Sequence, residues 1–457
     1  MHLSLARKKI GFWPQVALIF FTVSGGAYGI EALVGAVGTK WTMILVLALP
    51  VCWALPIALM VAELSSALPE QGGYYVWVRR GLGRFWGFQE GWWTLCYSAV
   101  DMALYPVLFV KYLSFFFPYL NGDTPAAMAV RWALCALFIA LALLFNLRGS
   151  YLVGVNALAN LAVVSLPFII LTIWGVFTGS WERLLEGITN PAPVSTGAAE
   201  IAAGLAIVLW NYCGWDNVST YAEECKDPQR NYPRALATTM VMVVASYAFP
   251  ILAGFKATIS PSDWSESAGW PTIAAQLGGP WLGAFTAFAA LLSAWAMFNS
   301  QLLYVSHLPS AMARDGWLPQ AFAKASPKTG APVATLAILS AAAAAFSALS
   351  LTKLMVVDII FYGMGLSLEF AALIALRRRE PKLHRGFRIP LGTKGLALMS
   401  APPLFLALAV AVFSTQGEYG SWLQVGLVGL GVLAGLLVFE RRRRGSVLQS
   451  PAPHAAG

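Results

Sequence analysis

The chain has 457 residues, of which 58% are hydrophobic and 11% are charged, and its formal net charge is +9. Soluble domains contain about 25% charged residues, so this composition excludes an ordinary soluble protein and indicates a polytopic membrane protein. The four histidines and five cysteines show no metal-binding spacing, and phosphate-loop and nucleophile-elbow motifs are absent. We therefore expect no metal, no cofactor and no enzymatic activity.

Apolar runs long enough to cross a bilayer follow one another along the chain. They predict twelve transmembrane helices at 12–38, 42–66, 86–117, 127–147, 151–177, 198–224, 235–257, 281–307, 332–351, 355–376, 395–414 and 420–439. The runs are continuous and do not alternate over about ten residues, which favours helices over a β-barrel. The predicted fold class is therefore an all-α integral membrane protein.

Lysine and arginine residues gather in alternate loops. With the N-terminus inside, 24 of the 30 fall in inner segments and six at outer positions, as expected when basic loops stay in the cytoplasm. This distribution predicts that residues 1–9 and the basic tail 441–457 both lie in the cytoplasm of a protein spanning the cell membrane. The positive charge then serves orientation and contact with anionic lipid headgroups, not binding of nucleic acid.

The first predicted helix contains the stretch SGGAYGIE, residues 24–31. Tight helix packing is one reason for glycines in a span. A break in the helix is the other, and it is tolerated where protein or a water-filled cavity covers the backbone. We expect a break, whose free amides near Gly25, Gly26 and Ala27 could hold a carboxylate while carbonyls of the preceding half-helix hold an ammonium or sodium ion.

A second interruption lies in the sixth span, in the stretch WNYCGWDN, residues 210–217. Breaks at matching positions of two halves are typical of transporters built from inverted repeats, with the substrate bound between the breaks. The spacing predicts a first repeat at 10–178 with helices 1 to 5 and a second at 198–377 with helices 6 to 10. Helices 11 and 12 would follow in 394–440.

Acidic residues lie inside the predicted spans, whereas no basic residue lies near the middle of any span. Those deep in the membrane are Glu31, Asp101 and Asp216, with Asp358 and Glu369 in the tenth span. Charge at membrane depth costs a few kcal/mol and is normally paired or functional. The acids therefore need protons, sodium or a cationic substrate, although Asp216 could instead cap the half-helix that follows it.

Aromatic side chains flank both breaks. Tyr28, Trp210 and Trp215 could stack on a substrate amine, or they could belong to the core.

Several blocks together resemble the amino acid–polyamine–organocation superfamily, and within it the branch of polyamine and amino-acid uptake transporters. They are SGGAYGIE, the third-span blocks GFQEGWW and DMALYPVLF, the sixth-span block WNYCGWDNVSTYAEECKDPQRNYPRAL, and MARDGWLP. The resemblance covers residues 10 to 440 and implies a leucine-transporter-like fold of five plus five helices, two additional helices and alternating access. It places the substrate site on residues at the two breaks, completed by the third and eighth helices: Ser24, Gly25, Gly26, Glu31, Trp210, Cys213, Trp215 and Asp216.

Two departures from the family pattern affect the expected site. Ala27 and Tyr28 stand where this branch usually has Pro and Phe, which would reshape the pocket. The fifth span lacks the lysine that replaces a sodium ion in several proton-coupled members. The coupling ion is thus open, with protonation of Asp101 or Glu31 as the first choice and a sodium site in the eighth helix as the second, built from Ser293, Asn299 and Ser300.

The main functional hypothesis is a proton-coupled secondary active transporter that imports amino acids, cationic ones among them. The alternative is a proton symporter for polyamines such as putrescine or spermidine. A polyamine has no carboxylate, so it would depend on acids and aromatics instead of glycine amides. A non-transporting nutrient sensor with the same fold is the alternative from another class, and the short termini disfavour it.

Overall fold

A computed structural model describes residues 9–189, 198–258, 261–264, 269–348, 351–413 and 422–448. Within these ranges the regular elements are helical, apart from one isolated β-bridge between Ile10 and Cys225. Eight helices of the described chain are long and apolar enough to cross a membrane. The prediction of an all-α, multi-pass membrane protein is confirmed.

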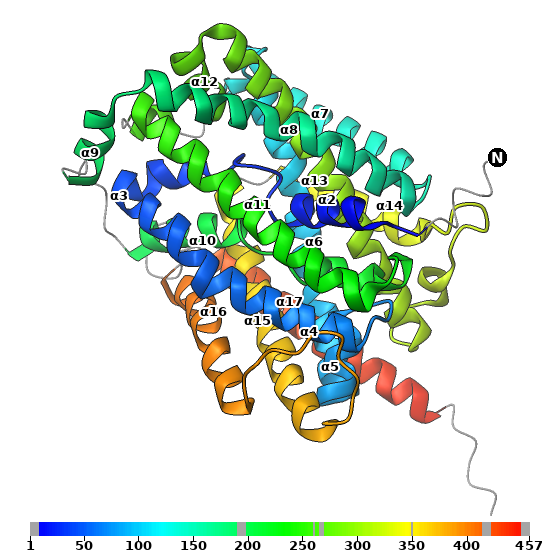
Figure 1. Cartoon of the computed structure of the whole chain (residues 1–457). Helices are drawn as coiled ribbons and strands as arrows, with labels where there is room; N and C mark the ends of the chain where they lie inside the picture. Colours follow the sequence, from blue (N-terminus) through cyan, green and yellow to red (C-terminus); the bar gives the residue numbers. More distant parts are fainter. Residues whose placement is uncertain are drawn as a thin grey trace, which may run out of the picture.

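The first part of the chain forms the elements shown in blue to bluish green in Figure 1. They are α2 (Phe12–Val23), α3 (Glu31–Leu49), the π-helical turn η1 (Pro50–Ala54), α4 (Leu55–Ala67), α5 (Tyr74–Leu82), α6 (Arg84–Leu113), η2 (Pro118–Asn121), α7 (Pro125–Asn146), α8 (Ser150–Thr178) and α9 (Trp181–Thr189). The predicted boundary between the first two spans is present as a kink at Gly38. Gly38, with φ 73°, bends the chain there without a loop, because glycine takes a positive φ at little cost.

The second half, from green to red in Figure 1, forms the remaining elements. They are α10 (Ala198–Trp210), η3 (Asn217–Glu224), α11 (Pro228–Ala257), η4 (Pro261–Trp264), α12 (Gly269–Gly278), α13 (Pro280–Arg314), η5 (Gln320–Ala323), α14 (Val333–Phe346), α15 (Leu351–Arg379), α16 (Thr393–Phe413) and α17 (Trp422–Leu448). Most predicted spans differ from the observed helices by only a few residues at each end. The short helices α5, α9 and α12 were not predicted, because none contains a run long enough to span a bilayer.

Both predicted interruptions are present. The segment between α2 and α3 contains Gly25 and Gly26 with φ of 65° and 96°, and Gly214, between α10 and η3, has φ 86°. Side chains with a Cβ pay about 1–2 kcal/mol in this left-handed region. The helices therefore stop where the sequence supplies glycine.

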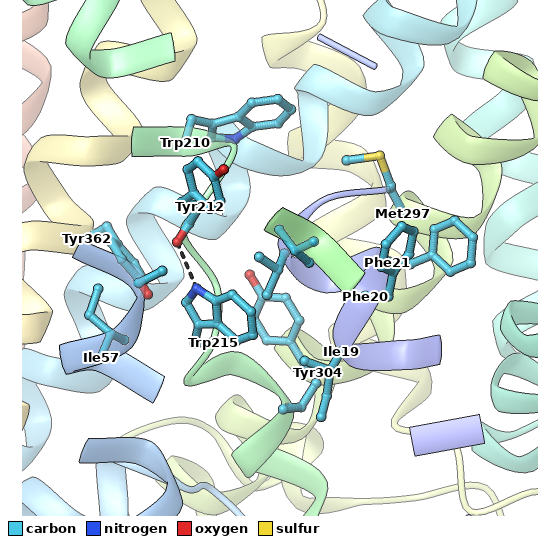
Figure 2. Packing of buried hydrophobic residues seen from close by; sticks show 14 of the residues in the cluster. Ile19, Phe20, Phe21, Ile57, Trp210, Tyr212, Trp215, Met297, Tyr304 and Tyr362 are labelled. Atoms are coloured by element: carbon cyan, nitrogen blue, oxygen red, sulfur yellow. Dashed lines mark hydrogen bonds between the residues drawn. The ribbon is translucent and has the colours of Figure 1, made fainter. Parts of the chain in front are cut away.

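Helix α6 lies at the centre of the molecule and packs against both α13 and α15. Close to the second break, the indole of Trp215 is fully buried among Ile19, Tyr304 and other apolar side chains (Figure 2). Its Nε1 donates to the carbonyl of Tyr212 at 2.9 Å. Trp215 is thus placed in the core and does not face an open pocket.

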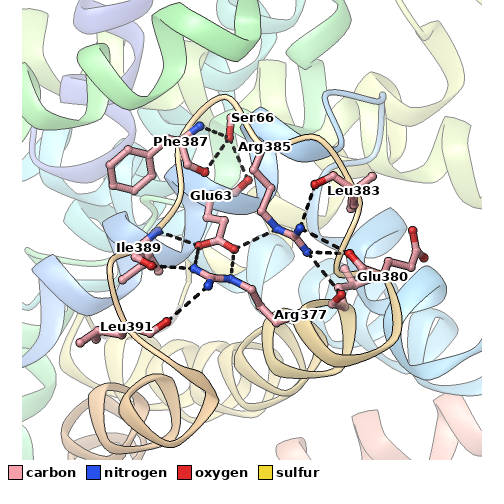
Figure 3. A network of polar contacts seen from close by, with 10 residues as sticks. Glu63, Ser66, Arg377, Glu380, Leu383, Arg385, Phe387, Ile389 and Leu391 are labelled. Carbon is pink, nitrogen blue, oxygen red and sulfur yellow. Dashed lines mark hydrogen bonds and ion pairs between the residues drawn. The ribbon is translucent and has the colours of Figure 1, made fainter.

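A buried ionic network ties α4 to the end of α15 and the segment that follows (Figure 3). Arg377 pairs with the fully buried Glu63 through both Nε and Nη2, and Arg385 Nε lies 3.1 Å from Glu63 Oε1. The Ile389 amide donates to the second carboxylate oxygen at 2.9 Å. Every oxygen of Glu63 is therefore satisfied, which such a buried charge requires.

Candidate functional site

The amide groups exposed by the first break are largely engaged within the chain. The Gly25 amide donates to the Phe20 carbonyl at 3.0 Å, and the Gly26 amide donates to Ser24 Oγ at 3.1 Å. Ser293 Oγ, from α13, donates to the Gly25 carbonyl at 2.5 Å. Of the three amides that were predicted to be free, those of Gly25 and Gly26 therefore have partners within the chain.

The carboxylate of Glu31 lies at the N-terminus of α3 and accepts a hydrogen bond from a backbone amide there. The Gly29 amide donates to Oε2 at 2.7 Å, the Tyr112 hydroxyl donates to Oε1 at 2.7 Å, and Lys111 Nζ lies 3.1 Å from Oε1. The Glu31 side chain is fully buried. A helix N-terminus attracts anions, and here a carboxylate of the chain occupies that position.

Ala27 and Tyr28 contribute to packing around the first break. The Ala27 carbonyl accepts a hydrogen bond from Trp270 Nε1 at 2.6 Å. The Tyr28 ring lies 4.7 Å from the Phe168 ring, and its hydroxyl donates to the Thr286 carbonyl at 3.2 Å. Both residues fix α12 and α13 against the break.

Asp101 of α6 lies between the two breaks and is 3% exposed. Its carboxylate accepts hydrogen bonds from Trp210 Nε1 at 2.9 Å, from the Tyr105 hydroxyl at 2.8 Å and from Gln301 Nε2 at 3.0 Å. These three donors are neutral. The structure thus brings the predicted residues Asp101 and Trp210 into direct contact and leaves the negative charge uncompensated.

Asp216 lies in the second break and does not cap the following helix through its side chain. Its Oδ1 instead accepts from the Tyr362 hydroxyl of α15 at 2.5 Å, and the same hydroxyl accepts from the Gly214 amide at 3.0 Å. Half-buried Cys213 points its sulfur at the Trp210 carbonyl, 3.1 Å away. The geometry does not support capping as the role of Asp216.

A third carboxylate, that of Asp358 on α15, completes the centre. It is 1% exposed, and its Oδ1 has no hydrogen-bond partner among the described residues. It interacts electrostatically with both Asp101 and Asp216. In the part of the chain that the structure describes, no basic side chain forms an ion pair with any of these three acids. The centre is therefore suited to a cation.

Asn299 is set apart from Ser293 among the three candidate sodium ligands of the eighth helix. Ser293 contacts the first break, whereas Asn299 pairs with Asn146 of α7 at 2.5 Å. Ser300 Oγ has no hydrogen-bond partner among the described residues. These contacts direct Asn299 towards α7 and away from the break.

A set of polar contacts joins neighbouring elements near the Arg84 end of α6. Gln71 Nε2 lies 2.6 Å from His307 Nδ1, and His307 Nε2 lies 3.5 Å from Glu224 Oε1. Asp315 forms an ion pair with Arg79. Burial lowers the pKa of the Arg79 guanidinium, but the hydrogen bond and charge of Asp315 outweigh it and raise the pKa. These contacts join α5, η3 and the end of α13.

Several residues of the site were not among the predicted ones. Tyr105 follows Asp101 by one helical turn, a spacing that could have revealed it. Gln301, Tyr362, Lys111 and Tyr112 carry no comparable signal, because their contacts depend on how α6, α13 and α15 pack.

Apolar spans, two broken helices and a buried acidic centre together define a multi-pass membrane transport protein. Residues 10–433 match the family model described as amino acid permease. The chain is 36% identical to polyamine transporter PUT1 of Oryza sativa subsp. japonica over 95% of its own length and 78% of the relative's. It is 33% identical to polyamine transporter RMV1 of Arabidopsis thaliana, over 95% of this chain and 85% of that one.

A bacterial relative, an uncharacterized transporter of Legionella pneumophila, is 27% identical over 78% of this chain and 79% of its own. The chain belongs to the amino acid permease family of the amino acid–polyamine–organocation superfamily, in the branch of the polyamine transporters. It is accordingly a transporter and not an enzyme.

Proposed function

We propose that this protein is a secondary active transporter that imports polyamines. The observation that carries the proposal is the group of three buried carboxylates, Asp101, Asp216 and Asp358, without a basic partner among the described residues. An uncompensated carboxylate at membrane depth is costly, and a polyamine supplies several ammonium groups in one molecule. The names of the relatives point to the same substrates.

The first break supports an amine over an amino acid. An α-amino acid presents a carboxylate, which would be held by helix amides at the break. In this chain the amides of Gly25 and Gly26 already have partners, and the carboxylate of Glu31 occupies the N-terminus of α3. A substrate with ammonium groups alone needs none of these donors. The main prediction, amino-acid import, is thus less well supported than its polyamine alternative.

In the proposed mechanism, an ammonium group binds Asp101, with the Trp210 indole and the Tyr105 ring beside it. The break residues Ser24, Gly25 and Gly26 and the sulfur of Cys213 border this position. The proton that the ammonium group displaces from Asp101 passes to the neighbouring Asp358 and is carried inward with the substrate, which makes Asp101 the coupling residue ahead of Glu31. Glu31 instead holds the broken helix against α6 through Lys111.

The finer architecture belongs to the same proposal. We infer twelve transmembrane helices, of which ten form two inverted repeats of five and two follow them. We also infer transport by alternating access. Both termini lie in the cytoplasm of a protein in the plasma or inner membrane, as the basic residues around Arg79 and Arg377 favour.

Uptake by purified protein in liposomes tests the function. Labelled putrescine, spermidine, arginine and leucine are supplied with a proton gradient and, separately, with a sodium gradient. We expect the two polyamines to accumulate under the proton gradient. Accumulation of leucine or arginine without either polyamine would refute the proposal and restore the amino-acid hypothesis.

A further inference from the structure

A stripe of buried side chains runs along one face of α6, from Asp101 towards the Arg84 end of the helix. Glu90, Thr94, Tyr97 and Asp101 follow one another at helical spacing, at intervals of four, three and four residues. Each is at least nine-tenths buried. An acid thus lies at each end of this stripe.

Helix α15 carries the same pattern in the opposite direction. Asp358, Tyr362, Gly365 and Glu369 repeat the intervals of four, three and four, and α15 packs against α6. The helices run antiparallel, since Arg80 just before α6 pairs with Glu380 just after α15 at 2.7 Å. Asp101 and Asp358 therefore form an upper level, and Glu90 and Glu369 a lower level about 16 Å away at the helical rise per residue.

Aromatic side chains lie between the two levels. The rings of Tyr97 and Tyr362 meet edge to face with centroids 5.6 Å apart. Their hydroxyls donate to residues of the second break, Tyr97 to Asn217 Oδ1 at 2.8 Å and Tyr362 to Asp216 Oδ1 at 2.5 Å. The second break thus meets the seam between α6 and α15 halfway between its acidic ends.

The lower level contains polar atoms that lack partners. Glu90 and Glu369 are each 1% exposed, and Oε2 of each has no hydrogen-bond partner among the described residues. Glu90 reaches α15 because Gly365 has no side chain, and a Cβ there would lie 3.1 Å from Glu90 Oε1. The two glutamates interact electrostatically with each other.

An independent group points to the same place. Tyr74 of α5 is fully buried, and its hydroxyl has no hydrogen-bond partner among the described residues. It lies near enough to Asp216, Glu90 and Glu369 for electrostatic interaction with all three. Burying polar groups without partners costs free energy, so this group of side chains is suited to a donor that brings several N–H bonds and a positive charge.

We propose that Glu90 and Glu369 form a second ammonium-binding site, which takes the far end of a linear tetraamine whose near end is bound at Asp101. The proposal rests on polyamine transport as proposed above. The polymethylene chain lies along Tyr97 and Tyr362, whose rings part to admit it. A site for a proton alone would need neither the matched spacing on two helices nor aromatic rings between the levels, whereas an extended polycation uses both.

Competition against uptake of labelled putrescine tests the proposal. Liposomes containing the full chain are titrated with unlabelled putrescine and with spermine, a linear tetraamine, to give two half-inhibitory concentrations. Glu369→Gln should raise the value for spermine about tenfold more than the value for putrescine, because one charge-assisted hydrogen bond to the longer substrate is lost. The exposed α9 variant Glu186→Gln is the matched control and should change neither value.

Two further variants keep the test decisive if Glu369→Gln is unstable. Glu90→Gln should change the ratio of the two values in the same direction. Gly365→Ala retains both charges but places a methyl group against Glu90, so it should also disfavour spermine. Equal effects on both substrates in variants with wild-type elution and thermal unfolding, or a changed pH profile alone, would overturn the second site.

The same assay separates this proposal from the function on which it depends. If wild-type protein transports putrescine and the ratio is insensitive to all three variants, only the second site fails. If wild-type protein transports no polyamine, the proposed function fails with it.

Discussion

Asparagine at position 101 would remove the charge of the proposed ammonium site and little else. The Asp101 carboxylate accepts from Trp210, Tyr105 and Gln301. An asparagine oxygen can keep one or two of these donors, and its NH₂ group then faces another. Loss of one acceptor lowers the free energy of unfolding by about 1–3 kcal/mol. Removal of a buried charge that has no basic partner raises it and offsets this loss. We expect Asp101→Asn to fold.

Its effect on binding should be large. A hydrogen bond between an ammonium group and a buried carboxylate contributes about 1.5–3 kcal/mol, so its loss should weaken putrescine binding about 10- to 150-fold. The same change should abolish proton-coupled accumulation and flatten its pH dependence, because the variant has no carboxyl group to protonate at this position.

Binding of labelled putrescine to purified protein and uptake into liposomes measure the two effects. Asp123→Asn, in the exposed loop before α7, is the matched control and should behave as wild type. Unchanged affinity and pH profile in a folded Asp101→Asn protein would remove Asp101 from the mechanism.

Three further changes test the break and the ionic networks. Gly25→Ala would place a methyl group 2.2 Å from Met297 Sδ at a φ of 65°. It should cost roughly 2 to 5 kcal/mol and block transport; wild-type uptake would return the glycine to a packing role. Glu31→Gln should lower the thermal unfolding temperature while changing putrescine affinity less than Asp101→Asn does, and the reverse order would make Glu31 the ligand. Arg377→Met should destabilise by about 3–5 kcal/mol because it strips a buried pair, whereas Arg80→Met, in a half-exposed pair, should cost at most about 1 kcal/mol; equal losses of unfolding temperature would contradict the burial argument.

The carboxylate of Glu31 at the N-terminus of α3 is the feature on which the proposed choice between an amine and an amino acid depends. The end of α3 can hold a carboxylate from a substrate or from the chain itself. In this protein the chain supplies it, and Lys111 and Tyr112 hold it in place. Under the proposed function, Asp101 selects a positively charged substrate, because its hydrogen-bond donors are neutral and its negative charge has no basic partner among the described residues.

The sequence by itself determined the class of the protein, the approximate helices and the position of both breaks. These features are local: a membrane helix follows from a continuous apolar run, and a break follows from glycines that tolerate positive φ. It also identified Asp101, because a carboxylate inside an apolar span is visible without any neighbour.

Only the tertiary structure decided what each polar residue contacts. Trp215 flanks the second break in sequence, yet its indole turns into the core. Glu31 resembled a ligand, yet Lys111 from the far end of α6 pairs with it. Asp216 could have capped its own helix, yet Tyr362 of α15 donates to it. The contacts of Glu31 and Asp216, and the packing of Trp215 against Ile19 and Tyr304, join residues distant in the chain. They depend on helix packing, which periodicity and composition do not encode.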